Sequence, residues 1–178
     1  MQSEDDALRP LSPYAAAKLA SEFYAQAFAA SYGLETVCLR FFNIFGPRQR
    51  ADSPYSGVIA LFVAAMKAGK QPTIFGDGLQ TRDFTYVSNA VQAVVRAAET
   101  PGVSGRVYNV GTGRRVTLLD LADALNRLLG TSIAALHGPA RPGDVRHSCA
   151  NIDRAWRELG YEPTVSFEEG LKRLLEMT

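Results

Sequence analysis

Residues 106–130 read RVYNVGTGRRVTLLDLADALNRLLG, a predicted strand followed at once by a glycine turn and a helix. The strand is expected over 106–110, where valine and tyrosine dominate. Apolar residues then recur at helical spacing from Leu118 to Leu129, behind a capping box of Thr117 and Asp120, and Gly130 ends the helix. A strand that leads directly into an amphipathic helix is typical of α/β proteins.

Strands and helices alternate on both sides of this stretch. Ser12 and Pro13 begin a predicted helix that runs to about Tyr32 and ends at Gly33. Further helices are expected over 58–68, over 88–99 with Ser88 as its cap, over 153–160 with Asp153 as its cap, and after a capping box of Ser166 and Glu169. Strands are expected over 36–41, 73–75, 84–86 and 132–136, with an ordered loop over 137–151. The alternation predicts an α/β fold with largely parallel strands.

Composition narrows the class of protein. The chain has 178 residues, of which 47% are hydrophobic and 21% charged, so it is long enough for one large domain and unlike a disordered or fibrous chain. The net charge of +1 favours no nucleic-acid partner, and no apolar run approaches the length of a bilayer span. Residues 1–6 are acidic and polar, unlike a secretory signal, and we expect a cytoplasmic protein in which Cys38 and Cys149 are reduced, buried thiols.

One pair of residues on the first predicted helix suggests acid–base chemistry. Tyr14 and Lys18 lie four residues apart, so their side chains emerge on the same face. A free tyrosine has a pKa of about 10, and a nearby ammonium group lowers it toward the range of a general acid or base. The pattern alone is also that of an amphipathic helix with an interfacial tyrosine and a solvated lysine.

Four stretches together favour a catalytic role for this pair over an ordinary amphipathic helix. They are LSPYAAAK at 11–18, RFFNIFGPRQ at 40–49, GDGLQTRDF at 76–84 and RPGDV at 141–145. In this order they resemble the extended short-chain dehydrogenase/reductase family, and within it the NAD-dependent nucleotide-sugar epimerases and dehydratases. The resemblance implies the C-terminal part of a Rossmann-type fold over 1–55, and a smaller α/β nucleotide-sugar-binding lobe over 56–178, with 81–110 returning to the Rossmann lobe. It covers essentially the whole chain.

The resemblance also implies roles for residues near the tyrosine. Tyr14 would take the proton from a sugar hydroxyl while NAD takes the hydride, and Lys18 would hold the nicotinamide ribose and lower the pKa of Tyr14. Phe41 would lie near the nicotinamide, with core packing at a strand end as the alternative. Asn43 would contact the sugar diphosphate. The implied reaction oxidises and then re-reduces carbon 4 of a UDP-hexose or UDP-N-acetylhexosamine.

A second group of residues would hold the nucleotide. Arg82 and Arg141 suit a diphosphate, because a guanidinium group forms paired, charge-assisted hydrogen bonds, and Asp144 can accept two ribose hydroxyls. Surface ion pairs, such as one between Arg82 and its neighbour Asp83, are the alternative. Family members place the following positions around the substrate: Val58, Phe62, Thr73, Phe75 and Val110.

The segment 141–151 resembles that of 4-epimerases that handle UDP-N-acetylhexosamines. At the gatekeeper position beside the sugar's 2-substituent this chain has Ser148, whose size would admit an N-acetyl group; simple loop packing is the alternative. The implied function is therefore a 4-epimerase. The alternatives are part of a nucleotide-sugar 4,6-dehydratase, decarboxylase or ketoreductase, or a non-catalytic UDP-sugar-binding module.

Gly111-Thr112-Gly113 is interpreted as a strand-to-helix turn, because Arg115 and Val116 stand where a dinucleotide fingerprint has its third glycine. The family's own fingerprint is not found in residues 1–178. The chain thus resembles the C-terminal half of a family member, and we expect it to show no turnover alone. A homodimer through the alanine-rich Tyr14 helix is also expected.

Overall fold

The computed structural model describes residues 1–52, 56–141 and 143–177. Its helices are α1 (Pro13–Tyr32), α2 (Val58–Lys67), α3 (Val87–Glu99), α4 (Leu118–Leu129), α5 (Asp153–Leu159) and α6 (Phe167–Glu176). Its strands are β1 (Val37–Phe41), β2 (Asn43–Phe45), β3 (Thr73–Phe75), β4 (Thr81–Arg82), β5 (Phe84–Tyr86), β6 (Arg106–Val110), β7 (Val116–Thr117) and β8 (Leu136–Gly138). None of the described helices combines the length and apolar character that a membrane crossing requires.

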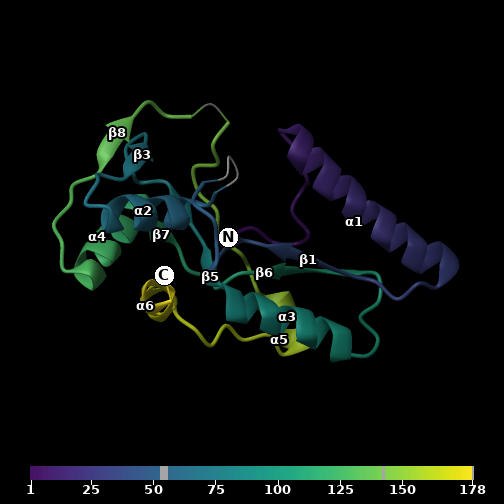
Figure 1. The fold of residues 1–178 in the computed structure, drawn as a ribbon. Coiled ribbons are helices and arrows are strands. Elements are labelled where there is room, and N and C mark those ends of the chain that lie inside the picture. The colour runs from purple at the N-terminus through teal and green to yellow at the C-terminus, as the bar shows by residue number, and fades with distance from the viewer. Residues whose placement is uncertain (53–55, 142, 178) are drawn as a thin grey trace.

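The strands pair mostly in parallel, which confirms the predicted fold class. β1 pairs with β6, β2 with β5 and β3 with β8 in parallel, whereas β4 and β7 are antiparallel. In Figure 1 the β1–β6 pair lies between α1 on one face and α3 and α5 on the other, while α2, α4, β3 and β8 form the opposite end of the molecule. The chain crosses between these two ends more than once, for example where β1 is followed by β2 and where β5 is followed by α3.

Two hydrophobic clusters correspond to these two ends. The larger contains Phe45, Phe62, Ile74, Leu121, Leu125 and Leu171, among other residues. The smaller joins α3, β6 and α5 through residues such as Ala93, Tyr108, Val110 and Tyr161. The predicted division into residues 1–55 and 56–178 stays a prediction; in the structure α5 packs with β6 and α3.

The helix ends follow local capping chemistry. The Ser12 hydroxyl accepts a hydrogen bond from the Ala15 N–H, and Gly33 ends α1 in the left-handed conformation. The predicted capping box of Thr117 and Asp120 is present at α4. At α6 only half of the predicted capping box forms: the Ser166 hydroxyl accepts from the Glu169 N–H, but the Glu169 carboxylate is bonded to Arg173.

Three local predictions were wrong. Helix α3 begins at Val87 after Tyr86, without a side-chain capping bond, so Ser88 is not its cap. Helix α5 follows Ile152, which leaves Asp153 as its first residue rather than its cap. The strand expected over 132–136 lies instead at 136–138, because the Asn126 side chain bonds both the N–H and the carbonyl of Ile133 and so occupies the backbone groups that a strand partner would need.

The cysteines agree in part with expectation. Both are free thiols in the structure, and Cys149 is buried as predicted, whereas Cys38 is only half-buried. Burial raises the pKa of both thiols above the ordinary value, which keeps them protonated at neutral pH.

Candidate active site

Tyr14 and Lys18 stand on the first two turns of α1, as the sequence predicted. The Ser12 cap and Pro13 fix where the helix begins, and so fix both side chains on one face. The Lys18 ammonium nitrogen lies 5.7 Å from the centroid of the Tyr14 ring. The Tyr14 side chain is 71% exposed, so its hydroxyl is available to a bound molecule.

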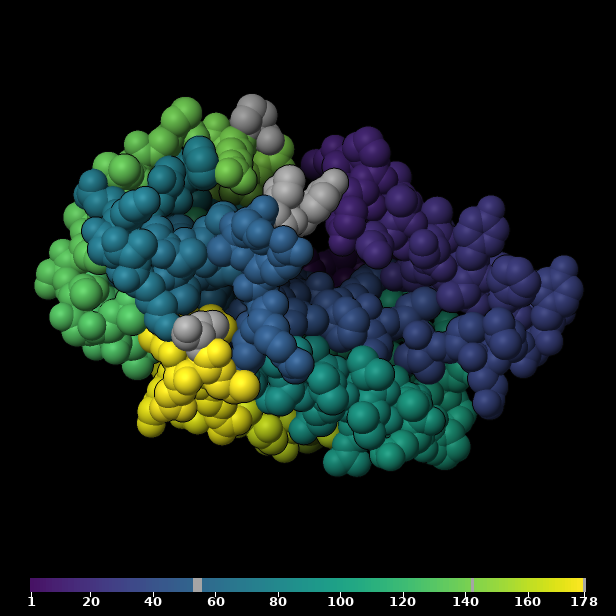
Figure 2. Space-filling view, viewed as in Figure 1, coloured from purple at the N-terminus to yellow at the C-terminus, as the bar shows by residue number. Residues whose placement is uncertain are grey.

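Two cavities meet at Tyr14. A cavity of about 730 Å³ is lined by Tyr14 and Lys18 together with Arg40 and Phe41 of β1. A second, of about 400 Å³, is lined by Tyr14 with Asn43, Phe45, Val58 and Phe84, among others. Figure 2 shows the surface hollowed beside the N-terminal end of α1, drawn in purple. The structure therefore brings Tyr14, Lys18, Phe41, Asn43 and Val58 together from four separate elements, α1, β1, β2 and α2.

The positions of β1 and β2 explain why Phe41 and Asn43 line the cavities beside Tyr14. Phe41 ends β1 in register with Val110 of β6, and its side chain is 46% exposed rather than packed in the core. Asn43 begins β2 in register with Phe84, and its N–H donates to the carbonyl of Asp83. The chain thus steps from one parallel pair to the next between these two residues.

The second predicted group is divided between β4, which carries Arg82, and β3, where Arg141 packs on Phe75. A guanidinium nitrogen of Arg82 lies 2.6 Å from an Asp144 carboxylate oxygen, and Arg82 also donates to the Val145 carbonyl at 2.7 Å. The guanidinium carbon of Arg141 lies 3.9 Å from the ring centroid of Phe75. Ser148 is tied to β4 by its N–H, which donates to the Thr81 carbonyl. The suggested Arg82–Asp83 ion pair is wrong, because Arg82 pairs with Asp144 and Asp83 is buried.

The other predicted residues are divided between surface and core. Thr73 is exposed and Phe75 half-buried on β3. Phe62 and Val110 are 1% and 0% exposed and belong to the larger and smaller clusters, respectively. Their observed contacts are those of core residues, and a role beside the substrate stays a prediction for both.

Asp83 accounts for the Gly111-Thr112-Gly113 turn. Its carboxylate is 0% exposed and accepts hydrogen bonds from the N–H and hydroxyl of Thr112 and from the N–H groups of Gly113 and Ala150. A Cβ on Gly111 would lie 2.6 Å from an oxygen of this carboxylate. The turn therefore binds an internal carboxylate, and its N–H groups do not form an external phosphate site. This agrees with its interpretation as a strand-to-helix turn.

The model of the NAD dependent epimerase/dehydratase family matches residues 1–111. The chain belongs to this family.

Similar proteins in the family are sugar-nucleotide epimerases. The UDP-glucose 4-epimerase of Mycolicibacterium smegmatis is 38% identical over 174 residues, which cover 98% of this chain and 55% of that protein. The UDP-glucose 4-epimerase of Thermotoga maritima, solved with UDP-glucose, has a TM-score of 0.94 at 40% identity and matches 99% of this chain and 56% of its own. The UDP-N-acetylglucosamine 4-epimerase of Methanobrevibacter ruminantium, in complex with UDP-N-acetylmuramic acid, has a TM-score of 0.92 at 39% identity, with 98% and 56% covered. The chain spans about half the length of the curated relatives it matches.

Two ion pairs near these residues were not predicted from the sequence. Glu22 forms a two-pronged ion pair with Arg40, and Asp77 forms another with Arg146. The spacing of Glu22, four residues after Lys18 on the same helix face, was an available signal. Nothing in the sequence paired Asp77 with Arg146, because they are 69 residues apart.

The Asp77–Arg146 pair links the turn after β3 to the loop that carries Arg141 and Asp144. The Arg146 guanidinium and the Leu79 N–H lower the pKa of Asp77 to about 2. The link is therefore retained throughout the ordinary pH range. Among the described residues, no cluster of histidine, cysteine or carboxylate side chains could hold a metal ion.

Proposed function

We propose that this chain forms the substrate side of a nucleotide-sugar 4-epimerase, which binds a UDP-hexose or UDP-N-acetylhexosamine and moves a proton at its C4 hydroxyl through Tyr14. The observation that carries the proposal is the position of Tyr14, which lines both cavities and has an ammonium group one helical turn away. A tyrosine hydroxyl that reaches a bound sugar hydroxyl can act as a general acid and base. The relatives named above support a 4-epimerase over a dehydratase, decarboxylase or ketoreductase.

The larger cavity fits the nicotinamide end of NAD. It combines an exposed aromatic ring, Phe41, with the Lys18 ammonium and the Tyr14 hydroxyl, which suit a planar ring and ribose hydroxyls, respectively. When bound there, NAD would accept and return a hydride. The part played by this chain is to hold the ribose through Lys18 and to exchange the proton at the Tyr14 oxygen.

The residues around β3 and β4 fit the nucleotide diphosphate of the substrate. Arg82 and Arg141 supply guanidinium groups for a diphosphate, and Asp144 supplies oxygens for the ribose hydroxyls. Arg82 and Asp144 are paired with each other in this structure, so nucleotide binding exchanges one set of charge-assisted bonds for another. Thr73 and Phe75 would flank the base, and Val58 and Phe62 would belong to the helix that closes over it. Asn43 would contact the sugar diphosphate, and Val110 would lie near the substrate.

The sugar class is proposed from Ser148. Its backbone is fixed to β4, so the side chain at this position has a defined place beside the loop of Asp144. A serine there leaves room for an N-acetyl group that a tyrosine would fill. Joined to a matching NAD-binding half, the chain should epimerise UDP-N-acetylglucosamine, and Ser148→Tyr should remove that activity while retaining activity on UDP-glucose. Equal loss on both sugars would reject the gatekeeper role.

The proposed partner is a second copy of this chain, bound through α1. No residue of α1 is buried, and its exposed side chains include Phe23, Tyr24, Phe28 and Tyr32. The alanines between them permit close approach of a second helix. Sedimentation should show a dimer for the unaltered chain and a monomer for Phe28→Glu; a monomer in both cases refutes this pairing. A cytoplasmic location fits the two free thiols.

Calorimetry with UDP tests the nucleotide site. The unaltered chain should bind UDP, and Arg141→Gln should weaken binding by at least tenfold, because it removes one of two guanidinium groups from the diphosphate. Arg127→Gln, which alters an exposed arginine on α4, is the matched control and should leave the affinity unchanged. Binding of UDP without turnover in the joined protein would favour the non-catalytic module, and no binding of UDP at all would refute the proposal.

A further inference from the structure

Helix α1 is attached to the rest of the chain by few contacts. None of its 20 residues is buried, although it carries Tyr14 and Lys18. In Figure 1 it lies along one face of the β1–β6 pair and extends well beyond it. Within a single copy of the chain, an exposed helix of this kind gains little orientation from apolar packing, so its direction relative to β1 depends on specific polar contacts.

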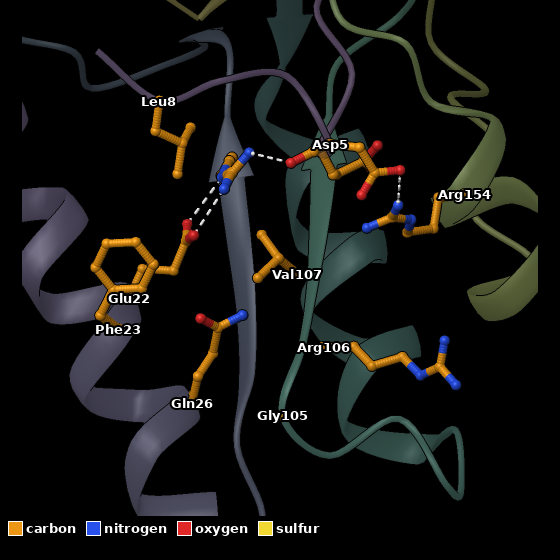
Figure 3. A pocket seen from close by; sticks show the side chains of 11 residues that line it. Asp5, Leu8, Glu22, Phe23, Gln26, Gly105, Arg106, Val107 and Arg154 are labelled. Atoms are coloured by element: carbon orange, nitrogen blue, oxygen red, sulfur yellow. Dashed lines mark hydrogen bonds and ion pairs between the residues drawn. The ribbon is translucent and has the colours of Figure 1, made fainter. Parts of the chain in front are cut away.

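The strongest of these contacts is made by Arg40 of β1. Its Nε lies 2.8 Å from one carboxylate oxygen of Glu22, and its Nη2 lies 2.7 Å from the other. The Arg40 side chain is 23% exposed and the Glu22 side chain 10%, so the pair is largely shielded from water. Figure 3 shows the two parallel bonds between α1 and β1. A two-pronged bond of this kind fixes the angle between its partners as well as their distance.

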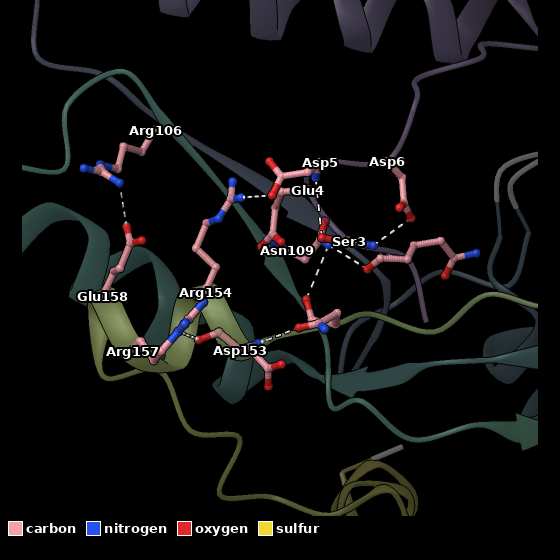
Figure 4. A network of polar contacts seen from close by, with 12 residues as sticks. Ser3, Glu4, Asp5, Asp6, Arg106, Asn109, Asp153, Arg154, Arg157 and Glu158 are labelled. Atoms are coloured by element: carbon pink, nitrogen blue, oxygen red, sulfur yellow. Dashed lines mark hydrogen bonds and ion pairs between the residues drawn. The ribbon is translucent and has the colours of Figure 1, made fainter.

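Arg40 is also joined to the N-terminal segment, which is itself firmly held. Its Nη1 donates to the Glu4 carbonyl at 3.2 Å. The Glu4 carboxylate accepts the Asn109 N–H at 2.8 Å, and Asp5 pairs with Arg154 of α5 at 2.6 Å, as Figure 4 shows. The guanidinium group therefore connects α1 to a framework made of β1, β6 and α5.

The geometry points to a positioning role. Glu22 follows Lys18 by four residues and Tyr14 by eight, so all three occupy one face of α1. Arg40 directly precedes Phe41, and Tyr14, Lys18, Glu22, Arg40 and Phe41 line the same cavity. We propose that the Glu22–Arg40 pair sets the rotation and tilt of α1 against β1 and so places Tyr14 and Lys18 over the candidate active site. The value of this placement for catalysis rests on the function proposed above.

If the Glu22–Arg40 pair served stability alone, breaking it would lower the free energy of unfolding but would leave the orientation of α1 unchanged. Burial of two charges costs desolvation energy that their attraction roughly offsets, so such pairs often contribute orientation rather than net stability. A lysine at position 40 would keep the charge but lose the planar fork. The positioning role therefore predicts that Arg40→Lys fails to preserve the orientation of α1.

Residual dipolar couplings of the backbone amides test the role directly in the 178-residue chain. In the unaltered chain the couplings of α1 and of the β1–β6 pair should fit one alignment tensor. In Glu22→Gln and in Arg40→Lys the α1 couplings should shrink at least twofold and depart from that tensor, while those of β1, β6 and α4 remain. Amide hydrogen exchange should accelerate at least tenfold in α1 alone.

Glu169→Gln is the matched control, because it breaks an ion pair of similar length on α6 that has no connection with α1. It should leave the α1 couplings unchanged. If Glu22→Gln fails to fold, Arg40→Lys carries the test. Unchanged α1 couplings in the folded variants, or exchange that accelerates equally in every helix, would overturn the proposal. Failure of the unaltered chain to bind UDP would refute the proposed function instead, and would leave this geometric result intact.

Discussion

Asp83→Asn is expected to destabilise the chain severely, because Asp83 is a fully buried carboxylate with four hydrogen-bond donors. One oxygen accepts from the N–H and hydroxyl of Thr112, and the other accepts from Gly113 and Ala150, at distances from 2.7 to 3.1 Å. An asparagine fits the same space but offers only one oxygen. Its amide nitrogen would face two N–H donors that it cannot accept from.

The expected loss follows from these bonds. Two charge-assisted hydrogen bonds disappear, each worth about 1.5–3 kcal/mol, so the free energy of unfolding should fall by about 3–6 kcal/mol. This is a large part of the about 5–15 kcal/mol that stabilises a typical domain. The consequence extends beyond the turn, because Asp83 connects the end of β4 to the chain after β6 and to residue 150.

Urea unfolding followed by circular dichroism measures the change. Asp83→Asn should lower the transition midpoint with an unchanged slope. Glu168→Gln, which removes only an exposed and long contact to Arg114, is the control and should unfold like the unaltered chain. A loss below about 1 kcal/mol for Asp83→Asn would refute the reasoning, because it would mean that the four donors find other partners.

Three further outcomes follow from single contacts. Gly170→Ala should lower the free energy of unfolding in urea by about 1–3 kcal/mol, because its Cβ would lie 2.7 Å from the Phe45 ring. Lys172→Ala, at an exposed position of α6, is the control. A Gly170→Ala chain more stable than the unaltered one would contradict this. The carboxylate of Asp77 should titrate at about pH 2 by carbon NMR and nearer its ordinary value in Arg146→Gln; equal midpoints would disprove the pairing. Burial raises the pKa of Tyr108 to about 12. The free energy of unfolding should therefore be retained below about pH 10 and fall as the pH rises toward 12, less steeply in Tyr108→Phe. Identical pH profiles for the two chains would rule this out.

The parts of the fold that local chemistry determines could be predicted. The Ser12 cap, the Thr117 and Asp120 capping box and the left-handed glycines at 33 and 130 lie within a few residues of the helix ends that they define. The strand at 132–136 could not be placed, because the side chain of Asn126, outside that segment, decides its conformation. Hydrogen bonds from a side chain of the preceding helix outweigh local β propensity there.

The candidate site shows the same limit. Tyr14 and Lys18 could be paired from their spacing, since the helix itself places both on one face. The partner of Arg82 could not be found, because Asp144 lies 62 residues away and reaches it only when the loop at 143–148 folds back over β4. The burial of Asp83 could not be found for the same reason, because its donors Thr112, Gly113 and Ala150 lie 29, 30 and 67 residues away.

The proposed function requires that Tyr14 contacts the hexose of a bound UDP-sugar. A crystal structure of the chain with UDP-N-acetylglucosamine tests this directly. We expect the diphosphate between Arg82 and Arg141 and the C4 hydroxyl within about 3 Å of the Tyr14 oxygen. A sugar bound away from Tyr14, or a diphosphate that contacts neither arginine, would contradict the account.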